Sequence, residues 1–599
     1  VSFGLNYNHN FFDDKLKINT NLRGARTRDI FDPGIGAAWD FDPTQPVLDP
    51  DNKAFGGYFS YGNSLAPRNP VSAAEQIQNE GQSFRTIGNM EIEYSLGDLL
   101  DGLSVKTNLG FDINQGDQNI FEPTTYTNTQ VANFNGLVKI ENFTRTNYLF
   151  DAYLNYDNAL NDRNNLKLTL GYSYQDFYEQ YPLFEGQNLS TDQFGINGPG
   201  QAEDVFPSNA VFENRLISFW GRAIYNFDER YVLTATLRRD GSTRFGPESR
   251  WGLFPSAAIA WRVLQEDWAA SLNSVFSDLK LRVSYGVTGN QEIADYRYLP
   301  QYAISDQRAR YQIGTDADGN PIFVNTARPN AYDPALQWEE TASLNVGLEF
   351  GFANGRINGA LEYYTQNTSQ LLFEVNVPAG TNLSDRVLTN IGELENEGVE
   401  LTLNANVLNT PDFSWDLTGN IAYNRNEVLG LSNIAGDAGI LRGGIAGGVG
   451  NNIQILRVGQ AIDAFYVYEH ILNDDGTPVS DEDDLMMYVD QNEDGQINEL
   501  DRRIFQNPAP DILYGLTTNF QYKSFDLAMT IRGAVGNYVY NNNASNRGYF
   551  QRVQGVNIGD DQFFLNNVHE SVLETQFVAP QYFSDYYIED ASFMRLDNV

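Results

Sequence analysis

A stretch of acidic and amide residues at 490–501 has the composition and spacing of a calcium-binding loop. EF-hand loops carry oxygen ligands at positions 1, 3, 5, 7, 9 and 12, and a glycine at position 6 where the chain turns sharply. Gly495 stands at position 6 of this stretch. The ligand positions are occupied by Asp490, Asn492, Asp494, Gln496, Asn498 and Asp501. We therefore expect a structural calcium site, with no catalytic role, that pins a loop.

The ligand positions would supply different kinds of oxygen. Side-chain oxygens are expected from Asp490, Asn492 and Asp494, a main-chain carbonyl from Gln496, and a direct or water-mediated contact from Asn498. Asp501 replaces the usual glutamate, and its shorter carboxylate would weaken calcium binding or favour magnesium. The alternative is an acidic turn without an ion, because Asp, Asn and Gly are common in turns. The neighbouring acidic run 481–484 is more typical of solvated charge than of a site.

Few other residues have the chemistry for catalysis. The chain has no Cys, which excludes disulfides, thiolate nucleophiles and Cys-bearing metal centres. Its three His residues, His9, His470 and His569, are scattered. With 78 Asp plus Glu residues, carboxylate pairs arise by chance and do not identify a glycosidase. The glycine-rich segment 443–450 lacks the Lys-Ser/Thr that a phosphate loop requires.

The charge balance limits the partners. The formal net charge is −39, and nucleic-acid binding requires a basic surface, so we expect no nucleic-acid partner. Net charge affects solubility and the ion atmosphere and does not decide the fold. The 13% aromatic content argues against a disordered chain.

The elements that would position these loops are strands, because apolar residues recur at every second position. Along 341–352, for example, Leu344, Val346 and Leu348 share one face, while Asn345 and Glu349 share the other. An Asn-Gly turn follows at 354–355 and a second alternating segment answers it. About 17 such segments of about ten residues predict an all-β chain built mostly of hairpins. Helical periodicity is nearly absent.

The connections between these segments alternate in length. Short ones lie at 12–15, 226–230 and 408–412. Long ones are expected at 28–82, 118–141, 188–214, 291–340, 366–393, 429–512 and 540–590. Strict alternation places all short turns at one end and all long loops at the other, which is typical of an outer-membrane β-barrel. The mean hydropathy of −0.42 does not oppose this, because a barrel strand hides its apolar residues at alternate positions. A soluble sandwich also alternates, but its strands are shorter, about 5–6 residues.

Several ordered motifs together resemble the SusC/RagA-type TonB-dependent outer-membrane transporters of Bacteroidota. The matching segments are 42–47 (DPTQPV), 69–71 (NPV), 239–246 (RDGSTRFG), 251–256 (WGLFPS), 284–291 (SYGVTGNQ), 336–339 (LQWE), 395–400 (ENEGVE) and 592–596 (SFMRL). The resemblance implies a transmembrane antiparallel barrel of 22 strands in the whole protein, with an N-terminal plug. We expect residues 1–599 to be a partial barrel, with the plug and closing strands outside them, and 485–505 to be an EF-hand-like loop within an extracellular loop.

The same resemblance implies a function and partners. Members import large nutrients, glycans or peptides, across the outer membrane of a Gram-negative bacterium, and are not enzymes. The implied partners are a SusD-like surface lipoprotein that caps the mouth, the TonB complex acting through the missing N-terminal part, outer-membrane lipid, and a second transporter–lid pair in a homodimer. Segment 443–450 would then be a flexible external loop or an approach to the lid. Loop aromatics could stack on sugar rings or apolar peptide side chains, or simply pack the loops: Tyr126, Phe134, Tyr296, Tyr298, Tyr302 and Tyr311.

Two other functions fit the residues. A passive porin or a structural or assembly-associated barrel would have the same strands, and a plug in the full-length protein would argue against it. A soluble multi-domain β-enzyme acting on polysaccharide would have shorter strands, a cleft with a carboxylate pair, and no need of detergent.

Overall fold

One large antiparallel sheet dominates the computed structural model. It describes residues 1–599 except 32–34, 65, 305–309, 377–383, 385, 432–437, 448–449, 482, 554–555 and 558–562. The sheet has 17 strands. They are β1 (Ser2–Phe11), β2 (Leu16–Ile30), β3 (Gln78–Ser95), β4 (Leu103–Glu122), β5 (Leu137–Asn161), β6 (Asn164–Leu189), β7 (Ala202–Phe227), β8 (Tyr231–Ser242), β9 (Trp251–Arg262), β10 (Phe276–Asn290), β15 (Glu339–Phe352), β16 (Ile357–Ser369), β19 (Glu393–Asn409), β20 (Phe413–Gly430), β25 (Ile512–Tyr522), β26 (Phe525–Val535) and β31 (Phe593–Asn598).

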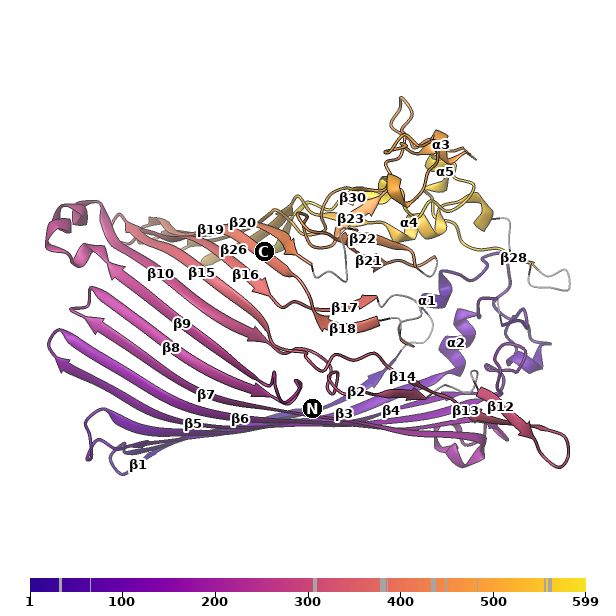
Figure 1. The fold of residues 1–599 in the computed structure, drawn as a ribbon, viewed down its shortest axis with the longest axis horizontal. Coiled ribbons are helices and arrows are strands. Elements are labelled where there is room, and N and C mark those ends of the chain that lie inside the picture. Colours follow the sequence, from indigo (N-terminus) through magenta and orange to yellow (C-terminus); the bar gives the residue numbers. More distant parts are fainter. Residues whose placement is uncertain are drawn as a thin grey trace.

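Each strand of this sheet pairs with the strands before and after it in this order, from β1–β2 to β26–β31. The sheet curls into a wide trough, with the short turns at one end and the long connections at the other (Figure 1). The predicted Asn-Gly hairpin is present between β15 and β16, where Asn354 and Gly355 have φ of 58° and 81°. The all-β fold and the segregation of turns from loops are therefore as predicted.

The two faces of the sheet differ in chemistry along rows of paired residues. One row that crosses seven strands is polar throughout: Asn19, Glu91, Asn108, Asp151, Ser173, Ser218 and Asp240. The row one residue away, on the opposite face, is mostly apolar: Ile18, Ile92, Thr107, Ala152, Tyr172, Phe219 and Arg239. Leu170 and Leu237 on that face are 61% and 54% exposed, so protein does not cover them. A membrane barrel has this distribution, with lipid against the apolar face.

Several strands are longer than predicted, and the corresponding loops are shorter. Strands β6 and β7 each have 26 residues and meet across a connection at 190–201, where we expected a loop over 188–214. The expected loop over 118–141 likewise shrinks to 123–136 between β4 and β5. About 9–11 residues cross a membrane, so these strands continue well beyond it. The outer ends of these strands have polar residues on both faces, so apolar and polar residues do not alternate there in the sequence.

The long connections contain small elements of their own. The minor strands are β11 (Tyr302–Ile304), β12 (Arg310–Thr315), β13 (Pro321–Asn325), β14 (Ala327–Pro329), β17 (Leu372–Asn376), β18 (Arg386–Asn390), β21 (Ile440–Gly444), β22 (Asn452–Leu456), β23 (Ala464–Val467), β24 (Arg503–Ile504), β27 (Tyr538–Tyr540), β28 (Val556–Asn557), β29 (Phe563–Phe564) and β30 (Ile588–Asp590). The α-helices are α1 (Ile35–Ala38), α2 (Pro70–Gln76), α3 (Asp484–Met487), α4 (Asn542–Arg547) and α5 (Val572–Thr575). Across the described part of the chain, none of the helices has the length and hydropathy of a membrane span.

The buried hydrophobic clusters lie mainly in these connections and at the strand ends next to them. One cluster packs Phe245, Phe254 and Trp338 together, and another packs Ile453, Phe465 and Ile588. A barrel interior that is polar leaves little room for an apolar core, so the loops form their own cores. These cores give the loops fixed positions at the mouth.

Candidate functional site

The polar face of the sheet forms a hydrogen-bonded wall. Ser173 donates to Asp151 at 2.5 Å, and Arg238 donates to Ser218 at 2.9 Å and to both carboxylate oxygens of Asp240 at 2.8 Å. Asp151, Ser218 and Asp240 are buried side chains. Hydrogen bonds of this kind offset the cost of burying polar groups, so they hold the wall residues in place. Sequence reading predicted a polar face but did not single out these residues.

Charges on this wall are largely paired with each other. Lys280 on β10 contacts Glu349 on β15 at 3.0 Å, and Arg282 contacts Glu349 at 3.3 Å. Arg282 also pairs with Glu362 on β16, whose second oxygen accepts from Asn345 at 3.2 Å. The wall in this region presents a neutralised polar surface to the lumen, which suits passage of a polar solute better than retention of one ion.

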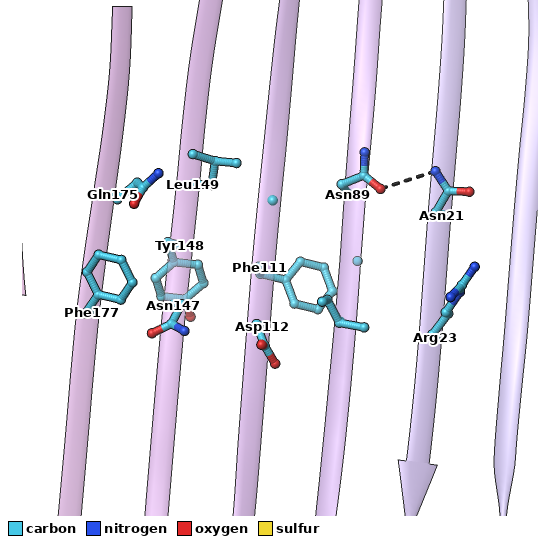
Figure 2. Close-up of a pocket in the computed structure, with 13 residues that line it drawn as sticks. Asn21, Arg23, Asn89, Phe111, Asp112, Asn147, Tyr148, Leu149, Gln175 and Phe177 are labelled. Atoms are coloured by element: carbon cyan, nitrogen blue, oxygen red, sulfur yellow. Dashed lines mark hydrogen bonds between the residues drawn. The ribbon is translucent and has the colours of Figure 1, made fainter. Parts of the chain in front are cut away.

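A hollow of about 550 Å³ lies in the wall formed by β2–β6. Figure 2 shows Asn21 and Asn89 joined by a hydrogen bond of 3.2 Å at one side of it. Leu149 and Phe177 border it on the strands opposite. Gly110 shares the row of Asn89 and Leu149, and its missing side chain leaves the recess. The lumen wall is therefore amphipathic at this point.

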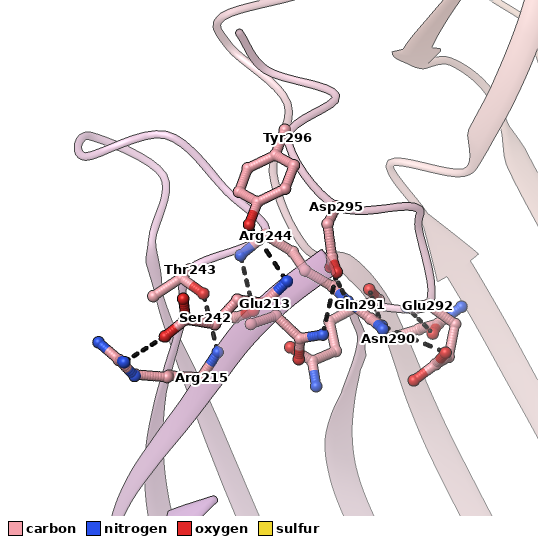
Figure 3. A network of polar contacts seen from close by, with 11 residues as sticks. Glu213, Arg215, Ser242, Thr243, Arg244, Asn290, Gln291, Glu292, Asp295 and Tyr296 are labelled. Carbon is pink, nitrogen blue, oxygen red and sulfur yellow. Dashed lines mark hydrogen bonds and ion pairs between the residues drawn. The ribbon is translucent and has the colours of Figure 1, made fainter. Parts of the chain in front are cut away.

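A polar network centred on the little-exposed side chains of Arg244 and Asp295 fixes the base of the loop that follows β10. The Arg244 guanidinium lies 3.0 Å from Asp295 and 3.2 Å from Glu292, and it donates to the main-chain carbonyl of Gln291 at 3.3 Å (Figure 3). Asn214 on β7 donates to the other oxygen of Asp295 at 3.3 Å. The network joins two of the motifs, RDGSTRFG and SYGVTGNQ, that carry the family resemblance. The spacing of the two motifs along the chain does not indicate that they meet.

Contacts between distant loops cross the mouth of the trough. Asp40, after α1, lies 3.1 Å from Arg547 and 3.0 Å from Arg552, both in the connection before β31. The buried Asp42 accepts from the main-chain N–H of Leu565 at 3.0 Å and from Thr44 and Tyr61. Burial alone would raise the pKa of Asp42, but these hydrogen bonds together lower it to about 2. The carboxylate is therefore ionised and holds two loops together.

The predicted metal loop lies in the connection between β20 and β25, as expected. Asp490 accepts from the main-chain N–H groups of Gly495 at 2.8 Å and Asp494 at 3.3 Å. Asn492 accepts from Asp494 at 3.0 Å, and Asp494 accepts from Gln496 at 2.9 Å. Gly495 has φ of 80°, the left-handed value that favours glycine. These successive turns bring the first three ligand positions to one side of a tight loop.

The other predicted ligands, Asn498 and Asp501, accept hydrogen bonds from main-chain groups of the loop. Asn498 caps a short turn by accepting from Leu500 at 3.0 Å. Asp501 is fully buried and accepts from Gln491 at 3.0 Å and from Asn498 at 2.8 Å. Hydrogen bonds from Gly495 first, and from other loop groups, lower the pKa of Asp490. The oxygen atoms at the predicted ligand positions fit a hard, oxygen-preferring cation such as calcium.

The loop would nevertheless need amide and main-chain oxygens to hold a metal. Among the described residues, no three His, Cys, Asp or Glu side chains gather closely enough to form a metal group. The ligand set of the prediction contains only three carboxylates, and amide or carbonyl oxygens fill the remaining positions. The fit therefore rests on the turn geometry and the mixed oxygen donors.

The glycine-rich segment packs against the last long connection. The main-chain N–H of Ala446 donates to Asn542 at 3.0 Å, and Asn542 donates back to the Ala446 carbonyl at 3.2 Å. A Cβ on Gly447 would lie 2.4 Å from the Tyr582 ring, so this position requires glycine. Ala446 and Gly447 thus have a packing role, and 448–449 lie outside the described residues.

One Ser–His contact occurs that the sequence did not predict. The His470 Nδ1 lies 2.9 Å from the Ser584 hydroxyl, and its Nε2 lies 2.8 Å from the Val479 carbonyl. The Nε2 atom must therefore carry the proton, which leaves Nδ1 to accept from Ser584. Burial lowers the pKa of His470. Because Ser584 is fully buried and no carboxylate accepts from the imidazole, the pair has a structural role.

Comparison with known proteins identifies relatives of this barrel. Residues 47–454 match the family described as TonB dependent receptor-like, beta-barrel. The chain is 34% identical to TonB-dependent receptor SusC of Bacteroides thetaiotaomicron, over 98% of this chain and 59% of that protein. It is 30% identical to TonB-dependent receptor P3 of Formosa agariphila, over 85% of this chain and 49% of that one. The structure of the RagAB peptide transporter superimposes with a TM-score of 0.76 at 22% identity, covering 99% of this chain and 64% of that one.

Proposed function

The chain belongs to the TonB-dependent receptor-like β-barrel family, and from this membership we propose that the whole protein imports a large nutrient across the outer membrane. The resemblance to SusC/RagA-type transporters, the barrel fold and the location in the outer membrane of a bacterium of the Bacteroidota agree with the family match and the relatives. The chain spans 59% of the length of SusC, and activity, substrate and partners are therefore proposed for the whole protein.

The proposed activity is TonB-dependent, energy-coupled uptake of a glycan or a peptide, with a SusD-like lipoprotein as the lid. The family match carries this proposal, and the paired charges of the lumen wall and the ordered loops at one end support it. The relatives are receptors and transporters by name, which favours transport over enzymatic activity. The TonB complex would act through the N-terminal part of the whole protein, and membrane lipid would cover the apolar face of the sheet. A homodimer of transporter–lid pairs is a further part of the proposal.

Uptake by cells tests this function. Deletion of the gene should abolish uptake of the cognate fluorescent oligosaccharide or peptide, and complementation with the full-length gene should restore it. Removal of TonB should abolish uptake equally. A passive porin or a structural barrel is the alternative, and uptake that persists without TonB would support it instead.

We further propose that the 490–501 loop binds calcium. The consecutive turns at Asp490, Asn492 and Asp494, and the buried Asp501, support this proposal. Calcium would neutralise these carboxylates and stiffen the loop between β20 and β25.

Protease sensitivity tests the calcium proposal in the full-length protein. Addition of EDTA should increase cleavage within 485–505 and leave the barrel intact, and added calcium should reverse it. Asp494→Ala should make the loop equally sensitive with and without calcium, whereas Asp474→Ala, in the same connection but outside the loop, should retain the response. Unchanged cleavage of the unsubstituted protein after EDTA would contradict the assignment.

A further inference from the structure

A second cavity, of about 880 Å³, lies at the end of the trough that carries the long loops. Its walls come from the outer ends of β6 and β7 and from three connections, and they include Arg68, Phe134, Glu185, Gln187, Asp204 and Phe206. We call it the rim pocket. Strand register pairs Glu185 with Phe206 and Gln187 with Asp204. Glu185 and Gln187 share the face of β6 that carries Ser173, and their partners share the face of β7 that carries Ser218, so the pocket opens toward the lumen.

The rim pocket stands outside the membrane. Glu185 follows Ser173 by twelve positions along β6, which at about 3.3 Å per residue is roughly 40 Å along the strand. On the same row of the sheet, the outer face carries the ion pair of Arg28 with Glu80 on β2 and β3. A solute that approaches from outside would therefore meet the rim pocket before the membrane-spanning lumen.

Two phenyl rings supply flat apolar surfaces to the pocket. Phe134 comes from the loop between β4 and β5, and Phe206 comes from β7. Both side chains are partly exposed, so their faces are accessible to a ligand. Aromatic rings combined with a few placed polar groups are typical of sites for small amphipathic ligands, such as sugar rings with apolar C–H faces and hydroxyl edges.

The polar groups of the pocket are oriented and retain hydrogen-bonding capacity. Glu185 accepts from Gln187 at 2.7 Å, and Asp204 accepts from Asn188 at 2.6 Å. An ionised carboxylate offers about four acceptor positions, so each can still accept from hydroxyl groups. The Arg68 guanidinium lies 5.1 Å from the centre of the Tyr126 ring, which restrains it.

The electrostatics of the pocket oppose an anionic ligand. Glu185 and Asp204 together outnumber Arg68 among the lining residues, and the whole chain has a net charge of −39. A uronate or sulfate group would therefore be repelled.

The sheet at the pocket has one unpaired edge, on the outer half of β7, because β8 pairs with β7 only from Leu216 onward. Peptides often bind by adding a strand to an exposed sheet edge. Here β6 and β7 remain paired through Leu189 and Ala202, beyond the pocket residues. The backbone hydrogen bonds between β6 and β7 are thus satisfied on the floor of the pocket, so recognition inside it uses side chains, which suits the many hydroxyls of a sugar.

On this basis, and building on the function proposed above, we propose that the rim pocket binds rings of a neutral oligosaccharide. Glu185, Gln187 and Asp204 accept from or donate to hydroxyls, while Phe134 and Phe206 contact the ring faces. The pocket is a first-contact subsite that selects uncharged glycans before they enter the lumen.

Binding to the purified full-length transporter in detergent tests this inference. The probes are the neutral hexasaccharides maltohexaose, cellohexaose, laminarihexaose and xylohexaose, the anionic hexagalacturonate, and hexaalanine. At least one neutral hexasaccharide should bind, and the Kd should rise about tenfold in Phe134→Ala/Phe206→Ala and in Asp204→Ala. Phe194→Ala and Glu203→Gln are matched controls outside the lining and should bind as the unsubstituted protein does.

Cellular uptake separates failure of the subsite from failure of the proposed function. TonB-dependent uptake of a neutral glycan with unchanged Kd in the pocket variants would overturn the subsite and leave the function standing. Binding of hexagalacturonate or hexaalanine in place of every neutral probe would overturn the glycan selectivity. Absence of TonB-dependent uptake of any solute would overturn the function itself. Folding of each variant is checked by its resistance to unfolding in detergent by heat.

Discussion

At the residue scale, Asp42 shows how one carboxylate stabilises the mouth. It is buried, ionised and shared between two loops, and its pKa of about 2 lies below the ordinary value of 3.8. A carboxylate whose pKa is lower in the folded state contributes stability above its unfolded pKa. That contribution is lost as the pH falls from about 4 to about 2.

The resulting prediction concerns acid sensitivity. Proteolysis at 39–61 and 547–567 by pepsin should increase between pH 4 and pH 2. In Asp42→Asn the same segments should already be cleaved readily at pH 4, with little further change on acidification. Asp51→Asn, which changes an exposed carboxylate in the same loop, should behave like the unsubstituted protein. If the increase in cleavage between pH 4 and pH 2 persists in Asp42→Asn, then groups other than Asp42 cause it.

At the same scale, the sequence predicted the ligand positions of the 490–501 loop but few of the other site residues. The spacing of Asp, Asn and Gly is local, so the turns follow from it directly. The pairing of Asp40 with Arg552 joins residues 512 positions apart. No periodic pattern marks such a contact, since both partners lie in loops.

At the element scale, the strands were predictable where one face is apolar and the other is polar. In β15 the alternation of Leu344, Val346 and Leu348 with polar residues marks both the strand and its outer face. In the outer halves of β6 and β7 water contacts the sheet, and the alternation fades. The boundaries were therefore wrong where the strands leave the membrane.

The two faces of β15 provide a matched test. Leu348→Arg places a charge against lipid and should destabilise the full-length protein by about 2–4 kcal/mol. Asn345→Arg changes the lumen face, next to Glu362, and should cost much less. Urea unfolding in lipid vesicles measures both. Equal costs would mean that the two faces have the same surroundings.

The Arg244 network predicts local loosening of one loop. Arg244→Met removes the cation that contacts the buried Asp295, and an unpaired buried charge is costly. Chymotrypsin should then cleave faster within 296–304. Arg215→Met removes a half-exposed cation on the opposite face of the wall, and such pairs contribute little, so cleavage should stay unchanged. Similar cleavage rates for both variants would mean that Arg244 does not stabilise this loop more than Arg215 does.

At the scale of the whole molecule, the long strands and the joined loops make the mouth a rigid extension of the barrel. The wall of β3–β7 projects beyond the membrane and carries the rim pocket, while the connections after β2 and before β31 meet through Asp40 and Asp42 (Figure 1). A lid protein would find a preformed platform there. The fold class was evident from the sequence, but this platform required the loop contacts.

The central claim is that lipid covers the apolar face of the sheet and an aqueous lumen borders the polar face. Residues 1–599 contain no Cys. Single cysteines introduced at positions 344–351 can therefore carry a nitroxide label in the full-length protein in outer membranes. Collisions with oxygen should peak at 344, 346, 348 and 350, and collisions with a water-soluble nickel complex should peak at the positions between. Water-soluble collisions of equal frequency at successive positions would contradict the membrane barrel.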